Sequence, residues 1–133
     1  MGDKKKTIGI LTSGGDCPGL NAAIRGVAKP ALEIFGMKVI GFSNGYRGLM
    51  DGDGRELFQS DMSGILTVGG TILGTSRESF KKLRKSPEKV QMMIDNYNKF
   101  ELDCLVVLGG NGTHKTANML SQQGLNVIGL PKT

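Results

Sequence analysis

The chain of 133 residues contains no tryptophan, one histidine and only two cysteines. Cys17 and Cys104 form no CxxC pair, which indicates reduced thiols in a cytoplasmic protein rather than a disulfide framework. A single histidine disfavours a metal site built on histidines. No apolar run approaches the ~20 residues of a membrane helix, and no signal-peptide core follows the charged N-terminus. We therefore expect a cytoplasmic protein with no membrane partner.

The positive charge is concentrated in one stretch of the sequence. The formal net charge is +5, and between Arg77 and Lys89 six basic residues oppose two acidic ones, a local net of +4. A basic patch suggests an anionic partner. Nucleic acid is disfavoured, because the chain lacks zinc-finger spacing and interleaved basic and aromatic residues. A solvated basic face and a phosphate-bearing small molecule are both open interpretations.

The order of apolar segments predicts an α/β fold. Short apolar runs indicate four strands, at residues 7–13, 38–42, 105–108 and 126–130. Helical patterns or start signals lie between them, over residues 19–29, 60–66, 86–97 and 111–123. Pro30 should stop or kink the first helix, and residues 43–56 and 74–85 are predicted to be irregular. This alternation predicts a three-layer fold with a mostly parallel sheet and helices on both faces.

Glycine is abundant, with 21 residues, and two glycine-rich loops join a predicted strand to a predicted helix. They span Ser13–Gly19 and Gly109–Thr113. The backbone N–H groups of such loops and the positive end of the following helix can bind phosphate. Both loops should lie at the same edge of the sheet, where they suggest an elongated polyanion such as a nucleotide triphosphate. The first loop is neither GxGxxG nor a Walker A motif, so a tight strand–helix connection is its alternative.

Single residues allow two interpretations each. Arg77 could clamp a phosphate bidentately or be an ordinary surface arginine. Tyr46 could stack on a base or anchor its loop. His114, in the first turn of a predicted helix, is expected to be exposed to solvent.

Five motifs resemble, in order, those of the 6-phosphofructokinases. They are Thr12–Arg25, Gly45–Leu49, Gly69–Arg77, Gly109–Thr113 and Gly129–Thr133. The resemblance covers nearly the whole chain but well under half of that family's subunit. It implies that residues 1–133 form a partial, Rossmann-like domain that binds the nucleotide or phosphoryl donor. The second, sugar-phosphate domain is absent from this chain.

The resemblance also implies an activity, its ligands and an assembly. A phosphoryl group would pass from ATP, or alternatively from diphosphate, to fructose 6-phosphate, giving fructose 1,6-bisphosphate in glycolysis. Mg²⁺ would accompany the reaction, and the parent protein would be a homo-oligomer. Two alternatives are a nucleotide kinase with a similar glycine loop, such as an NAD kinase, and a non-catalytic module that binds a nucleotide or a sugar phosphate.

The resemblance assigns roles to individual residues. Gly14 would border the phosphates, and Tyr46 would lie against the adenine. Gly112 and Thr113 would bind phosphate oxygens. Asn111 stands where the family usually has an acidic magnesium ligand, and an amide oxygen brings no charge.

The remaining implied roles concern phosphoryl transfer itself. Arg77 would stabilise charge during transfer, and Thr133 would approach the transferring group. The family's catalytic aspartate follows two positions after Thr133, beyond this chain, so the chain alone is expected not to phosphorylate fructose 6-phosphate. The donor signals are mixed: Gly112 admits ATP, whereas Lys132 is common in diphosphate users. Diphosphate users often carry an aspartate at the position of Gly112, where it would exclude ATP. Such exclusion constrains the donor more strongly than the added attraction of a lysine, so ATP is the predicted donor.

Overall fold

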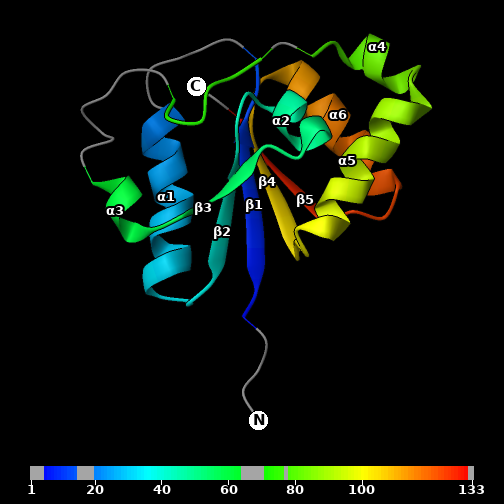
Figure 1. The fold of residues 1–133 in the computed structure, drawn as a ribbon. Helices are drawn as coiled ribbons and strands as arrows, with labels where there is room; N and C mark the ends of the chain where they lie inside the picture. Colours follow the sequence, from blue (N-terminus) through cyan, green and yellow to red (C-terminus); the bar gives the residue numbers. More distant parts are fainter. Residues whose placement is uncertain (1–4, 15–19, 64–70, 77, 132–133) are drawn as a thin grey trace.

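A five-stranded sheet forms the centre of the fold, in the order β3-β2-β1-β4-β5 (Figure 1). The computed structural model describes residues 5–14, 20–63, 71–76 and 78–131. Four strands run parallel to one another: β1 (Thr7–Thr12), β2 (Lys38–Phe42), β4 (Cys104–Gly109) and β5 (Val127–Pro131). The fifth strand, β3 (Gly54–Leu57), is antiparallel to β2. The predicted α/β fold with a mostly parallel sheet is confirmed.

Helices cover both faces of the sheet (Figure 1). On one face lie α1 (Leu20–Glu33) and α3 (Gln59–Met62). On the other lie α2 (Tyr46–Asp51), α4 (Phe80–Arg84), α5 (Pro87–Lys99) and α6 (Asn111–Gln122). In the central strand β1, Ile10 packs into the hydrophobic cluster on the face covered by α1 and α3. Leu11 packs into the cluster on the opposite face, because successive strand side chains point to opposite faces. This double cover explains why all of β1 is buried.

The helix α1 continues through Pro30 to Glu33, so Pro30 does not stop it. Proline removes the hydrogen bond to the carbonyl of Gly26, four residues earlier. Gly26 is exposed, so water can hydrogen-bond to that carbonyl. Buried Ala31 keeps the last turn packed, and the Ile34 N–H donates to the Pro30 carbonyl at 2.8 Å. Packing of Ala31 and hydration of the Gly26 carbonyl together offset the free-energy cost of Pro30 in the helix.

Both segments predicted to be irregular contain regular structure. Residues 43–56 include α2 and most of β3, and residues 74–85 include α4. The side chains of Tyr46, Leu49 and Met50 on α2 are buried against the sheet, which stabilises a helix too short to form alone. The connection through α2 is short, so β3 returns antiparallel rather than by a parallel crossover. The predicted helix over residues 60–66 corresponds in part to α3, and residues 64–70 lie outside the described residues.

Two further observations concern membrane-spanning helices and the cysteines. Within the described ranges, no helix is both long and apolar enough to cross a membrane. Cys104 is a free thiol, and burial together with the neighbouring carboxylate of Asp103 raises its pKa. Cys17 lies outside the described residues.

Candidate phosphate-binding site

The carboxyl ends of β1 and β4 lie side by side. Thr12 is paired with Leu108 across the two parallel strands, and the Ser13 N–H donates to the Leu108 carbonyl at 2.9 Å. The chain therefore leaves both strands at the same edge of the sheet, as predicted for the two glycine loops. In open α/β sheets this edge is the usual location of ligand sites.

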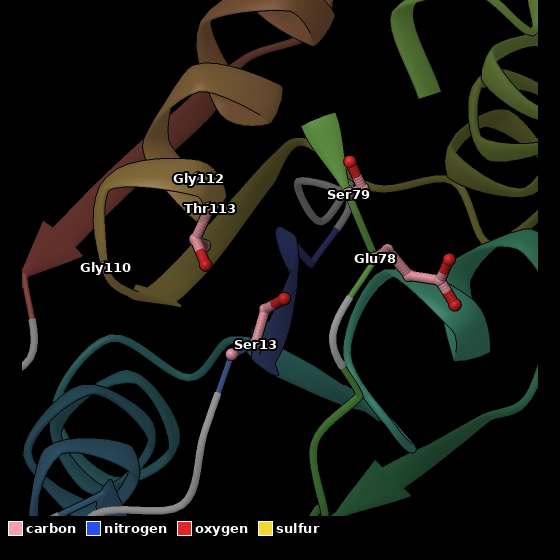
Figure 2. Close-up of a pocket in the computed structure, with 7 residues that line it drawn as sticks. Ser13, Glu78, Ser79, Gly110, Gly112 and Thr113 are labelled. Atoms are coloured by element: carbon pink, nitrogen blue, oxygen red, sulfur yellow. The ribbon is translucent and has the colours of Figure 1, made fainter. Parts of the chain in front are cut away.

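A cavity of about 270 Å³ opens between the two loops. Seven of the described residues line it: Ser13, Gly14, Glu78, Ser79, Gly110, Gly112 and Thr113 (Figure 2). Figure 2 shows the hydroxyl groups of Ser13 and Thr113 facing the space between the loops, whereas the Glu78 carboxylate points away from Thr113. These described lining residues are glycines, residues with hydroxyl side chains and one with a carboxylate. It suits a polar ligand that is bound by backbone groups and hydroxyls.

The sequence loop Gly109–Thr113 runs from the last residue of β4 through Gly110 into the first turn of α6. It packs tightly at Gly109 and is open at Gly112. A Cβ at Gly109 would overlap the Thr113 hydroxyl and lie 2.6 Å from the Ser13 carbonyl oxygen, whereas a Cβ at Gly112 would meet no atom within 4 Å. No side chain caps α6 at Gly110, and its first turn has no acidic residue. The first turn of this 12-residue helix thus carries neither a side-chain cap nor an acidic residue of its own, an arrangement that favours anions.

The end of β1 is held by the segment Thr71–Ser76. The Gly14 N–H and the Ser13 hydroxyl both donate to the Ser76 carbonyl, at 3.2 and 3.4 Å. The buried Thr12 hydroxyl donates to the Gly74 carbonyl at 2.9 Å. Gly14 lines the cavity, and its N–H is already engaged by protein. Its place beside a phosphate stays a prediction.

Tyr46 is an anchor within the core. Its side chain is 1% exposed, and its hydroxyl donates to the Thr113 carbonyl at 2.7 Å. Burial raises the pKa of this hydroxyl well above its ordinary value. The ring has no exposed face for an adenine, so the expected stacking on the base is not found and the anchoring interpretation fits.

His114 is half-buried, which corrects the expectation of a solvent-exposed side chain. Its Nε2 lies 3.0 Å from the Gly109 carbonyl oxygen. Its ring packs on Gly129 of β5 so closely that a Cβ there would overlap Nδ1. The sequence could not signal this contact, because it depends on where β5 joins the sheet.

The predicted metal ligand, Asn111, is exposed at the first position of α6 and does not belong to the described lining of the cavity. Glu78 is the one carboxylate in that lining. Among the described residues, no three or more His, Cys, Asp or Glu side chains form a group that could hold a metal ion. The role of Asn111 as a magnesium ligand stays a prediction. Arg77, Lys132 and Thr133 lie outside the described residues.

The basic stretch begins at the cavity. Glu78 and Ser79 line it, and α4 starts at the next residue, with the Ser79 hydroxyl accepting the Lys82 N–H. The exposed basic side chains of α4 are Lys81, Lys82 and Arg84. The start of α4 beside the cavity is compatible with a phosphate-bearing ligand. Sequence reasoning missed Glu78 and Ser79 as lining residues, although they directly follow Arg77.

Comparison with known proteins decides the family. The model of the family described as Phosphofructokinase matches residues 7–133. The chain belongs to the phosphofructokinase family. This match confirms the resemblance carried by the five motifs.

Named relatives and a solved structure agree with this membership. The chain is 64% identical to an ATP-dependent 6-phosphofructokinase of Spirochaeta thermophila over 137 residues, covering 96% of this chain and 37% of the relative. It is 47% identical to a pyrophosphate–fructose 6-phosphate 1-phosphotransferase of Dictyoglomus thermophilum over 130 residues, covering 97% and 36%. The crystal structure of Pichia pastoris phosphofructokinase in the T-state superposes with a TM-score of 0.89 at 32% identity, covering 100% of this chain and 16% of that one. The chain thus spans about a third of the length of the curated phosphofructokinases it matches.

Proposed function

We propose that this chain is the donor-binding part of a 6-phosphofructokinase, which transfers a phosphoryl group from ATP to fructose 6-phosphate. The observation that carries the proposal is the cavity where the two glycine loops meet, beside an uncapped helix end and a basic helix. The names of the relatives support the sugar phosphate as acceptor. A family match over residues 7–133 favours this function over an NAD-kinase-like enzyme or a binding module.

In this proposal the cavity stabilises the negative charge of the donor. The N–H groups of the first turn of α6 and the Thr113 hydroxyl donate to phosphate oxygens, and the basic side chains of α4 attract the anion. Mg²⁺ bound together with the donor would offset part of the negative charge of the phosphates. By resemblance, Arg77 and Thr133 act on the transferring group and Lys132 adds charge. The 133 residues supply the donor side of the reaction, so we expect binding without turnover of fructose 6-phosphate.

The space at Gly112 supports ATP as the donor. Gly112 lines the cavity, and a Cβ there would meet no protein atom. An aspartate would therefore fit the fold, and its carboxylate would occupy space beside the bound anion. Glycine leaves that space empty and adds no negative charge there, so the additional phosphate of a nucleotide can be accommodated. Because relatives of both donor types are similar to this chain, the choice of donor needs a direct test.

Isothermal titration of the 133-residue chain with MgATP and with magnesium pyrophosphate tests the proposal. We expect MgATP to bind more tightly. Removal of one hydroxyl in Thr113→Val should weaken binding by about threefold to tenfold. The matched control is Thr116→Val on the same helix, because the Thr116 hydroxyl is buried without a hydrogen-bond partner among the described residues. Tighter binding of pyrophosphate by more than tenfold would contradict ATP as the donor, and absence of binding by both would contradict the function.

A further inference from the structure

We infer that Tyr46 and His114 are positioning residues that fix the two ends of the loop Gly109–Thr113 for anion binding, through hydrogen bonds to the Thr113 and Gly109 carbonyl groups. Each side chain is hydrogen-bonded to one of these carbonyls, and neither belongs to the described lining of the cavity. The inference rests on the proposed donor-binding function and adds the side chains that shape the site from outside it.

His114 fixes the first peptide of the loop. The Gly109 carbonyl can only accept a hydrogen bond, so Nε2 of His114 must carry the proton at their separation of 3.0 Å. In a trans peptide the C=O of one residue and the N–H of the next point in opposite directions. Holding the Gly109 oxygen at His114 therefore directs the N–H of Gly110, which lines the cavity, to the other side. The close contact with Gly129 keeps the imidazole ring in place.

Tyr46 fixes the other end of the loop. Its hydroxyl donates to the Thr113 carbonyl at 2.7 Å from within the hydrophobic core, where the ring packs with Leu49 and other buried side chains. The hydroxyl keeps its proton at neutral pH, because burial raises its pKa. With the Thr113 carbonyl held on the core side, the Thr113 hydroxyl faces the cavity (Figure 2).

Such anchoring matters because of the composition of the loop. Gly109 ends β4 and Gly112 lies in the first turn of α6, and Gly110 joins the two elements. A glycine at such a junction has large conformational freedom. A loop that is ordered before the ligand arrives avoids the loss of entropy on binding and presents its N–H groups in place. Loss of one anchoring hydrogen bond should thus weaken anion binding, in addition to any effect on folding.

The test measures binding of inorganic tripolyphosphate to the 133-residue chain by titration calorimetry, with urea unfolding of each variant alongside. Tyr46→Phe and His114→Phe keep the rings and remove the donors, and each should weaken binding by about threefold to tenfold. His114→Gln, which retains a donor, should restore affinity to within about twofold of the original chain.

Tyr97→Phe is the matched control. Tyr97 belongs to the same hydrophobic cluster, and its hydroxyl accepts the Asn126 N–H at 3.3 Å, remote from the loop Gly109–Thr113 in sequence and outside the described cavity lining. This variant should lose stability but keep its affinity for tripolyphosphate. Because His114 is the only histidine, ¹⁵N NMR of its imidazole also reports directly whether Nε2 is protonated.

The outcomes separate the two proposals. Tripolyphosphate affinity that is unchanged in both Tyr46→Phe and His114→Phe would overturn the positioning role and leave the donor site intact. An imidazole protonated at Nδ1 alone would overturn the role of His114. Failure of the original chain to bind tripolyphosphate would overturn the proposed function together with this inference.

Discussion

The two loops that meet at the cavity differ in what their backbone groups already bind. In the loop Gly109–Thr113, side chains hold two carbonyl groups, and the first turn of α6 has no side-chain cap. At the end of β1 the N–H groups themselves are engaged, with Ser13 donating to Leu108 and Gly14 donating to Ser76. Among the described residues, the start of α6 therefore has no side-chain cap, whereas the N–H groups of Ser13 and Gly14 both donate to protein carbonyl groups.

In the proposed site, the start of α6 and the residues Ser13 and Gly14 would contribute differently to anion binding. An anion obtains N–H donors at the start of α6 without breaking protein hydrogen bonds. It obtains the Gly14 N–H only by displacing the Ser76 carbonyl. We therefore expect substitutions on the β4 side to change binding directly, and those on the β1 side to act through the segment Thr71–Ser76.

The largest expected effect is that of Gly109→Ala. The new methyl group would overlap the Thr113 hydroxyl and press on the Ser13 carbonyl, so we expect a loss of about 1–3 kcal/mol in the free energy of unfolding. Gly112→Ala, on the same loop, has open space and should be neutral or stabilise α6 by up to ~1 kcal/mol. Urea unfolding of both variants checks this, and equal stability of the two would contradict the packing described for the loop.

The second expected effect is a change of donor preference in Gly112→Asp. The side chain fits the fold, and its charge at the first turn of α6 is compatible with the helix dipole. Its carboxylate should repel the longer anion more, weakening MgATP relative to magnesium pyrophosphate by about tenfold, or ~1.4 kcal/mol. Gly112→Asn is the control for size without charge. A variant that binds MgATP as well as the original chain would refute the argument from space and charge.

A third substitution, Thr12→Val, tests the β1 side. It removes the buried hydroxyl that donates to the Gly74 carbonyl and lies 3.1 Å from the Thr71 hydroxyl. We expect a loss of about 1–2 kcal/mol, since these groups lose their partner, and faster amide exchange at Leu73 and Gly74. Exchange in the loop Gly109–Thr113 should stay unchanged. If the amides of that loop exchanged faster as well, the end of β1 and the loop Gly109–Thr113 would not be independent in local stability.

The smallest expected effect is a pH dependence carried by Tyr46. Burial raises the pKa of its hydroxyl in the native state, whereas the unfolded chain ionises it from about pH 10. The stability linked to this group is present below pH 10 and falls as the pH rises further, by about 1 kcal/mol between pH 10 and pH 11. Tyr46→Phe should therefore approach the stability of the original chain as the pH rises. Parallel pH profiles of the two proteins would contradict this.

Much of this architecture follows from the sequence. Apolar runs and turn residues predict the four parallel strands, because burial on both faces requires continuous apolar segments. The pair Ser86-Pro87 predicts the start of α5 at Pro87. The glycine loops predict the edge of the sheet at which the cavity lies, since each follows a parallel strand. The motifs in order predict the family.

Only the tertiary structure decided the roles of Tyr46 and His114. Local sequence patterns report the periodicity of burial, but they do not report which distant group a polar side chain will bind. Tyr46 and Thr113 are 67 residues apart, and the contact of His114 with Gly129 exists only after β5 has joined the sheet. The sequence by itself determined a phosphofructokinase-like sheet with a glycine-lined edge. The assembled core determined which side chains fix the carbonyl groups of that edge, because hydrogen bonds between remote segments form only when packing brings them together.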